Sequence, residues 1–202
     1  IPTTDVAICN GYDHLLHSIH DDATIKVFGT VKAKTSEGFL LSIHGYQPVF
    51  VHDTNVAVEI GDDLDLCATK TTSRGLPELK DVSWYHMVEW GNEYNEDPQN
   101  ITDYFDSFGT EYYAYISYFG ELEVTNDGHY NIYVDGAYNR IGTILTMPDQ
   151  QDLLGEYNGQ KVLIEGYFAG YSNGSDGRVC LNTILKNVKT PNNGGSTEDV
   201  IP

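Results

Sequence analysis

An approximate internal duplication is the feature that most constrains the fold of this chain. The tetrapeptide "LKDV" at 79–82 recurs as "LKNV" at 185–188, and upstream of them "GDDLDLCA" (61–68) aligns with "GQKVLIEG" (159–166). A chain of 202 residues is long enough for two domains of about 100 residues, each with its own core. The repeated segments therefore predict two similar domains in tandem.

The aligned segments alternate apolar and polar residues. Leu64 and Leu66 share one face of the first segment, and Val162 and Ile164 share one face of the second. A period of two is typical of a strand with one buried face. We expect these four side chains to point into the interior of a β-barrel.

A second pair of matching segments adds a glycine in the middle of a strand. "IKVFGTVKA" (25–33) aligns with "YISYFGELEV" (115–124), so Gly29 matches Gly120. Because glycine weakens a strand interior, its presence there predicts a bend or bulge where a barrel turns a corner. "MPDQQDLLGEYN" adds a short helix between the third and fourth strands of the second copy. Five short strands in this arrangement predict an all-β fold with short helices, in the form of two tandem OB-fold-like five-stranded barrels.

Segments outside the repeats set the predicted domain boundaries. Apolar residues at helical spacing predict an amphipathic helix over residues 5–19, and "ITDYFDSFG" (101–109) is its weaker counterpart in the second copy. The acidic stretch "GNEYNEDPQN" contains a proline and marks the junction. We therefore predict an N-terminal domain with its lead-in helix over 1–95, a C-terminal domain over 96–190, and a linker to a further region over 191–202.

The charge of the chain argues against nucleic acid as a partner. Thirty acidic residues oppose eleven basic ones, which gives a formal net charge of −19. Nucleic acid is bound largely through Lys and Arg, and the densest basic group here is only Lys26, Lys32 and Lys34. A chain this acidic repels phosphate at long range unless its cations gather in one groove.

Several stretches together resemble the OB-like modules that occur in tandem in exported and surface proteins of Bacteroidota. In the second half these are "YYAYISYFGELEV", "HYNIYVDGA", "YNGQKVLIEGYFAGYS" and "VCLNTILKNV"; in the first half they are "FGTVKAKTSEGFLLS", "VEIGDDLDLCATK" and "GLPELKDV". The stretch "SIHGYQPVFVHD" departs from the short third strand of such modules. The resemblance implies a bacterial protein that is exported to the periplasm or cell surface, with a lipoprotein anchor in the full-length chain as one arrangement. It implies no catalytic motif.

Two groups of potential metal ligands are better explained as solvated surface side chains than as metal sites. His14, His17 and His20 are three residues apart and therefore drift around a helix, unlike the i, i+4 pairs of many metal sites. The carboxylates of "GDDLDL" alternate with leucines, which places them on the solvated outer face of a strand. We predict no metal site and no cofactor.

Aromatic residues supply the candidate ligand-binding positions. Tyr133 and Tyr138 lie near the strands of the second barrel that bind ligands in OB folds, and Trp84 and Trp90 follow the last strand of the first barrel. Exposed aromatic rings can stack on sugars or bases, although aromatic residues in strands more often fill a core. No nucleophile, metalloprotease or phosphate-binding motif is present.

The sequence therefore favours a protein that is not an enzyme. We expect a non-catalytic accessory or interaction module of an exported, cell-envelope-associated bacterial protein, with a glycan or a protein as the partner. The alternative hypothesis is an OB module that binds single-stranded nucleic acid beside a nuclease or similar enzyme. It needs a basic groove with exposed aromatic rings.

Overall fold

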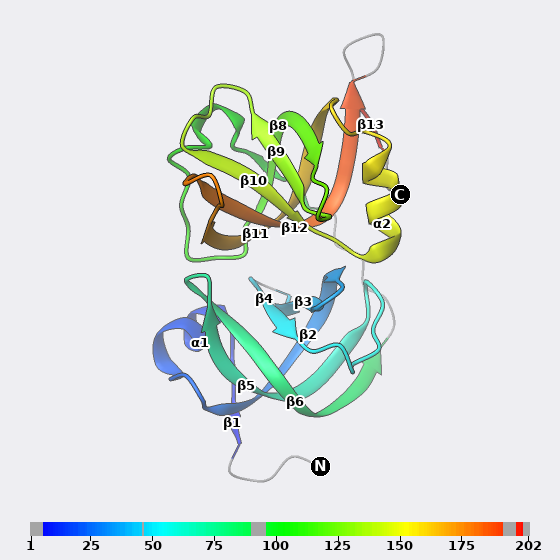
Figure 1. Cartoon of the computed structure of the whole chain (residues 1–202). Coiled ribbons are helices and arrows are strands. Elements are labelled where there is room, and N and C mark those ends of the chain that lie inside the picture. Colours follow the sequence, from blue (N-terminus) through cyan, green and yellow to red (C-terminus); the bar gives the residue numbers. More distant parts are fainter. Residues whose placement is uncertain (1–5, 46, 90–95, 192–196, 200–202) are drawn as a thin grey trace. The chain divides into compact units, whose positions relative to one another are not determined.

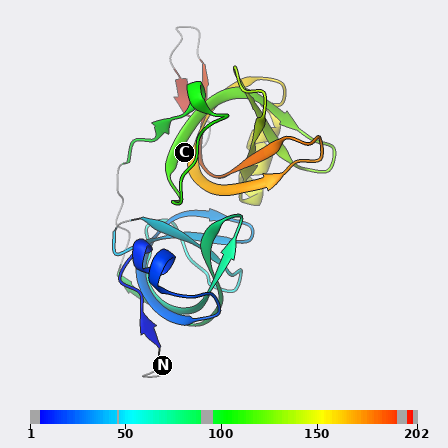
Figure 2. The same cartoon turned by 90° about the vertical axis from the view of Figure 1, so that its left-hand side faces the viewer.

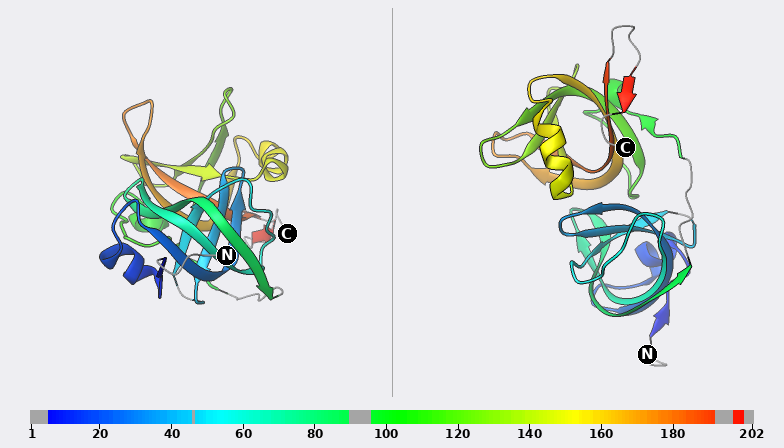
Figure 3. Two further views of the ribbon diagram at one scale, coloured as in Figure 1. Left: turned by 90° about the horizontal axis from the view of Figure 1, so that it is seen from below. Right: turned by 90° about the vertical axis from the view of Figure 1, so that its right-hand side faces the viewer.

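The computed structural model describes residues 6–45, 47–89, 96–191 and 197–199. The chain divides into two compact units, Ile1–Asn95 and Glu96–Pro202. Strands account for 55% of the structure and helices for 10%, which confirms the predicted all-β class with short helices. Each unit is a closed five-stranded barrel, and Figure 3 shows both as rings of strands in its right-hand view.

The first barrel closes through five strands in the order β2-β3-β4-β6-β5, with β5 returning to β2. All neighbours are antiparallel except β4 and β6, which run parallel. The elements of this unit are β1 (Ala7–Ile8), α1 (Tyr12–Ser18), β2 (Thr24–Thr35), β3 (Gly38–Ile43), β4 (Pro48–His52), β5 (Asp63–Ser73) and β6 (Leu76–Glu89) (Figure 1).

The second barrel repeats this plan in the order β8-β9-β10-β12-β11, with β11 returning to β8 and with β10 and β12 parallel. The helix α2 lies between the third and fourth strands, as predicted. The elements are β7 (Gln99–Asn100), η1 (Thr102–Tyr104), β8 (Tyr115–Val124), β9 (Tyr130–Val134), β10 (Arg140–Leu145), α2 (Pro148–Gly155), β11 (Lys161–Asn173), β12 (Val179–Pro191) and β13 (Thr197–Asp199).

Equivalent backbone hydrogen bonds confirm that the two glycine-led segments match. The Gly61 N–H donates to the Val31 carbonyl over 2.8 Å, and the Gly159 N–H donates to the Leu122 carbonyl over 2.7 Å. Both glycines have a positive φ, at 96° and 81°, which glycine adopts without the steric cost of a side chain. The same turn therefore leads into the fourth strand of each barrel.

The predicted inward faces of these strands are confirmed. Leu64, Leu66, Val162 and Ile164 are all fully buried. Burying a leucine or isoleucine side chain stabilises a fold by roughly 1.5–3 kcal/mol relative to exposure. The alternating residues thus supply the interior of each barrel.

The mid-strand glycines have a different role from the predicted bulge. A Cβ at Gly29 would lie 2.4 Å from the Ser42 carbonyl oxygen, and one at Gly120 would lie 2.4 Å from the Tyr133 carbonyl oxygen. The irregularity in β2 falls later, between Val31 and Ala33, and the pairing of β8 with β9 is regular. Glycine is required at both positions because a neighbouring strand approaches too closely for any side chain.

The lead-in segment corrects the prediction of one helix over residues 5–19. Ala7–Ile8 forms the strand β1, which pairs with β2 in parallel, and α1 spans only Tyr12–Ser18. Pairing with β2 satisfies backbone groups that a helix would otherwise use, while the Ile8 side chain remains 63% exposed. In the second unit Gln99–Asn100 pairs in the same way with β8, followed by η1.

The C-terminal segment also differs from the prediction of a linker over 191–202. Thr197–Asp199 forms β13, which pairs with the end of β12 in antiparallel orientation. Figure 2 shows β13, in red, beside β12. Part of the predicted linker is therefore a strand of the second unit.

The tetrapeptides that first suggested the duplication do not occupy equivalent positions. Leu79 pairs with Lys70 on the neighbouring strand. Counting from the glycine turns, the residue of β11 equivalent to Lys70 is Phe168, and its partner on β12 is Thr183 rather than Leu185. "LKDV" and "LKNV" are thus two residues out of register, a shift that keeps the leucines on the inward face.

Candidate functional site

Tyr133 lies on the outer face of the second barrel, because its neighbours Ile132 and Val134 point inward and are buried. The Tyr133 hydroxyl donates a hydrogen bond to Glu123 on β8 over 2.9 Å. The guanidinium of Arg178, from the β11–β12 turn, lies 5.2 Å from the centre of the Tyr133 ring. The side chain of this predicted ligand residue therefore already contacts neighbouring residues of its own barrel, on the outer face that OB folds use for binding.

Charged and polar side chains around Tyr133 are already paired with one another. The Arg178 side chain donates to Asp176 over 2.8 Å, and this hydrogen bond lowers the pKa of the Asp176 carboxyl. Burial and the hydrogen bond to Glu123 raise the pKa of Tyr133. A ligand on this face would have to compete with contacts that already exist.

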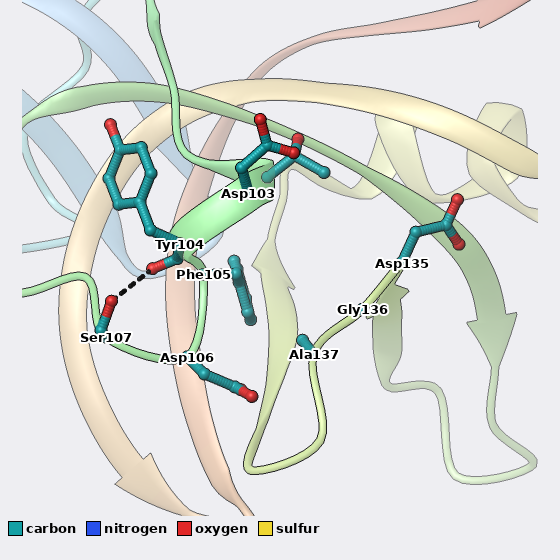
Figure 4. A pocket seen from close by; sticks show the side chains of 9 residues that line it. Asp103, Tyr104, Phe105, Asp106, Ser107, Asp135, Gly136 and Ala137 are labelled. Atoms are coloured by element: carbon teal, nitrogen blue, oxygen red, sulfur yellow. Dashed lines mark hydrogen bonds between the residues drawn. The ribbon is translucent and has the colours of Figure 1, made fainter.

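A pocket of about 300 Å³ lies at one end of the second barrel, and three of its lining residues are aspartates. In Figure 4 the segment with Asp103 and Tyr104 forms one side, and the loop with Asp135, Gly136 and Ala137 forms the other. We call it the acidic pocket. Its lining residues are Thr102, Asp103, Tyr104, Phe105, Asp106, Ser107, Asp135, Gly136 and Ala137.

Asp106 holds the two sides of the acidic pocket together. Its carboxylate accepts hydrogen bonds from the backbone N–H groups of Tyr138, Asn139 and Arg140, over 2.8, 3.1 and 3.1 Å. Burial alone would raise the pKa of Asp106, but these N–H groups and the charge of Arg140 lower it below its ordinary value. Asp106 is thus committed to shaping the β9–β10 turn.

Arg140 also holds the segment 105–108 in place. Its guanidinium donates to the carbonyls of Phe105 and Phe108, over 3.2 and 2.5 Å, and to the Tyr171 hydroxyl over 3.2 Å. It also lies 4.6 Å from the centre of the Tyr171 ring. Charge-assisted bonds of this kind hold the pocket wall against the barrel end without any ligand.

The other two aspartates differ in their availability. Asp135 forms an ion pair with Lys161 at 2.9 Å. Asp103 is exposed and has no hydrogen bond or ion pair within residues 6–45, 47–89, 96–191 and 197–199. Beside it, Tyr104 is 39% exposed, and its hydroxyl accepts a hydrogen bond from the Gln99 side chain over 2.6 Å. The pocket therefore presents the Asp103 carboxylate next to the Tyr104 ring, whose position is set by the hydrogen bond to Gln99.

The four predicted ligand residues do not form one site. Tyr138 is 81% exposed and directly follows the pocket loop. Trp84 was predicted to follow the last strand of the first barrel, but it lies within that strand, β6, and pairs with Cys67. Its ring stacks on His86 at 6.3 Å and lies 5.6 Å from the ammonium of Lys26. Trp90 lies outside the described residues. Tyr133 and Tyr138 belong to the second unit, whereas Trp84 belongs to the first.

The acidic pocket itself was missed at the sequence level. Its residues come from the lead-in segment "ITDYFDSFG" and the turn "VDGAYN", which are separate in the chain. The repeated combination of Asp with Tyr or Phe was the available signal. Nothing in the local pattern indicates that these two segments meet.

The described residues contain no group of three or more His, Cys, Asp or Glu side chains placed to hold a metal ion. The prediction that the carboxylates of "GDDLDL" lie on a solvated face is wrong for Asp63. This residue is only 2% exposed, and its carboxylate accepts a hydrogen bond from Thr30 over 2.5 Å. The strand β5 is covered on both faces there, which period-two alternation alone does not reveal. Of the three histidines, His17 is exposed on α1 and His14 is half-buried there, whereas His20 is exposed but lies beyond the end of the helix at Ser18.

Comparison with protein-family models and with curated protein sequences finds no match to this chain. In the part of the chain that the structure describes, no helix is both long enough and apolar enough to cross a membrane.

Proposed function

We propose that the chain is a non-catalytic, glycan-binding accessory module of an exported, cell-envelope-associated bacterial protein, and that the acidic pocket holds the sugar. The observation that carries this proposal is a pair of residues in a pocket of about 300 Å³. The Asp103 carboxylate has no partner among the described residues, and the neighbouring Tyr104 ring is positioned by the hydrogen bond between its hydroxyl and Gln99. That volume is at the lower end of the range for small-molecule sites.

The chemistry of the pocket suits a sugar. Carboxylate oxygens accept hydrogen bonds from hydroxyl groups, and an aromatic ring offers an apolar surface with a polar tip. OB-type barrels bind oligosaccharides as well as oligonucleotides. Because Asp106 and Arg140 already fix the pocket walls, little ordering is required when a ligand binds.

The distribution of the carboxylates supports binding rather than hydrolysis. Glycoside hydrolysis generally uses two carboxyl groups on either side of the scissile bond. Asp106 is committed to three backbone N–H groups and Asp135 to Lys161, which leaves Asp103 without a second free carboxylate in the pocket. Neutral or amine-bearing sugars fit this charge better than sulfated ones.

The same charge disfavours the alternative of single-stranded nucleic acid. Phosphate groups would meet Asp103 and Asp135 in the pocket, and Glu121 and Glu123 on β8. The proposed location in the periplasm or at the cell surface rests on the resemblance to Bacteroidota modules. Fractionation of the source cells with an antibody to this chain tests that location, and a cytoplasmic signal would contradict it.

A glycan array followed by calorimetry tests the binding proposal. We expect the whole chain to bind a restricted set of neutral or amine-bearing glycans, and both Asp103→Asn and Tyr104→Ala to weaken the binding about tenfold, or about 1.4 kcal/mol. Asp152→Asn makes the same chemical change at an exposed position of α2 outside the pocket lining and serves as the control.

Two outcomes would contradict the proposal. One is the absence of binding to every glycan on the array. The other is unchanged affinity in both pocket variants when circular dichroism shows that they are folded. A labelled oligonucleotide in the same assay at low salt separates the nucleic-acid alternative, for which we expect no binding.

A further inference from the structure

The end of the last strand is treated differently in the two barrels. In the second barrel, Lys189, Thr190 and Pro191 of β12 pair with β13 (Figure 2). A short antiparallel strand thus covers this edge, and Lys189 has strand partners on both sides, Leu163 on β11 and Asp199 on β13.

The equivalent edge of the first barrel is defined by the shared strand register. Tyr85 pairs with Leu66, as Val188 pairs with Ile164. One residue further, His86 takes the place of Lys189. Met87 and Val88 therefore stand where the second barrel is paired with β13.

Within the described residues, this edge of β6 has no strand beside it. The strand pairs with β4 only from Glu78 to Lys80, and beyond that point it pairs with β5 alone. We call the segment from Trp84 to Val88 the open edge. An uncovered row of backbone N–H and C=O groups is a template for another strand.

Three of the five side chains of the open edge are apolar and exposed. Tyr85 is 41% exposed, Met87 38% and Val88 47%, whereas Val188 in the second barrel is fully buried. The segment has no Asp, Glu, Lys or Arg, although the chain as a whole carries a net charge of −19. Charged side chains are a common protection of edge strands, and here they are missing.

We propose that the open edge binds an extended strand of a partner protein by antiparallel β-augmentation, in the position that β13 occupies on the second barrel. Backbone hydrogen bonds supply affinity in such complexes, and alternate side chains supply selectivity. The partner strand is apolar, because it meets Tyr85, Met87 and Val88. It carries one acidic residue opposite His86, in the register in which β13 places Asp199 against the equivalent Lys189. This surface is independent of the acidic pocket.

A synthetic peptide tests the proposal on the whole chain. The probe is a short, end-capped peptide of alternating valine and threonine with one central aspartate, and its twin carries N-methyl groups that remove alternate backbone donors. We expect the first peptide to bind and to protect amides of the open edge from hydrogen exchange. The methylated twin is expected to bind at least about tenfold more weakly.

Charge placed on the edge gives the matched variants. Met87→Lys and Val88→Lys are expected to weaken peptide binding about tenfold, whereas Ile60→Lys, a change at a 52% exposed apolar residue of the same unit outside β6, leaves it unchanged. Circular dichroism of each variant checks folding.

Three results would overturn the proposal. The first is peptide binding that ignores both N-methylation and the edge variants. The second is strong exchange protection of the open edge in the free chain, which would mean that the edge is already covered. The third is concentration-dependent dimerisation that Val88→Lys abolishes, since a second copy would then occupy the edge.

Discussion

The two barrels share one frame of strands but fill its centre with different side chains. Three equivalent inward positions, found by counting along the paired strands, illustrate the difference. They are Val27, Val49 and Leu79 in the first barrel, and Tyr118, Gly142 and Thr183 in the second.

In the second barrel one large ring takes the space of several smaller groups. Tyr118 is fully buried, and its hydroxyl shares a hydrogen bond with the Thr183 hydroxyl over 2.7 Å. A Cβ on Gly142 would lie 2.8 Å from the Tyr118 ring. The comparison teaches that the frame tolerates a different core when a glycine on a neighbouring strand makes room for the large ring and the buried hydroxyl is paired.

The largest effect is expected from moving one residue of the first core into the second. Gly142→Val, which introduces the side chain of Val49, should destabilise the second barrel by about 1–3 kcal/mol, because the new side chain collides with the Tyr118 ring. Urea unfolding followed by circular dichroism measures this loss.

Restoring the whole first-barrel set sharpens the test. The triple variant Tyr118→Val, Gly142→Val, Thr183→Leu should be at least about 1 kcal/mol more stable than the sum of its single changes, because contacting residues couple. Simple additivity would show that the three positions do not compensate for one another.

The next largest difference is expected at alkaline pH, where the second barrel should lose more folding stability than the first. Burial raises the pKa of Tyr118, and burial together with the charge of Glu96 raises the pKa of Tyr167. The equivalent residues of the first barrel, Val27 and Thr69, do not titrate, although burial raises the pKa of the Cys9 and Cys67 thiols of that unit. Above the unfolded tyrosine pKa of about 10, the unfolded chain loses protons that the folded chain keeps, so stability falls as pH rises, by up to about 1.4 kcal/mol per pH unit for each tyrosine.

The two units can be followed separately in this measurement. Both tryptophans of the chain, Trp84 and Trp90, precede residue 96, so their fluorescence reports on the first unit. Tyrosinate absorbance reports mainly on the second unit, which holds eleven of the fifteen tyrosines. Tyr118→Phe should reduce the alkaline loss of stability, and an unchanged pH profile in that variant would speak against its role.

The smallest difference between the barrels is expected at the two glycine turns. Gly61→Ala and Gly159→Ala each force a side chain into the left-handed region, at a cost of roughly 1–2 kcal/mol. Because the two glycines make the same backbone hydrogen bond, the two losses should agree within about 0.5 kcal/mol. A clear difference, measured by urea unfolding of each unit, would break the equivalence of the turns.

Much of the strand arrangement was predictable from the sequence because it follows from residue patterns within each segment. Alternation placed Leu64 and Ile164 inside, and the glycine turns aligned the fourth strands of both copies. The lead-in strand β1 was not predictable in the same way, because two residues are too few to show a period. Similarly, the burial of Asp63 depends on a neighbouring strand that its own segment does not encode.

The candidate site was less predictable than the frame. Tyr138 was selected as an exposed aromatic residue and is exposed, but the acidic pocket beside it joins two segments more than thirty residues apart through Asp106. Tyr133 was selected for the same reason, yet Glu123 and Arg178 engage it. Partners of this kind are brought together only when the barrel closes.

By itself the sequence determined the duplication, the inward face of each strand and the class of fold, because these follow from residue type and short-range spacing. Only the tertiary structure decided the register of "LKDV" against "LKNV", the meeting of the two pocket walls, and which strand edge is covered. Each of these depends on bulges and on contacts between distant segments, such as the register shifts at Cys67/Thr69 and Glu165/Gly166. No single residue type marks a bulge in the sequence, yet a bulge decides which side chains finally meet.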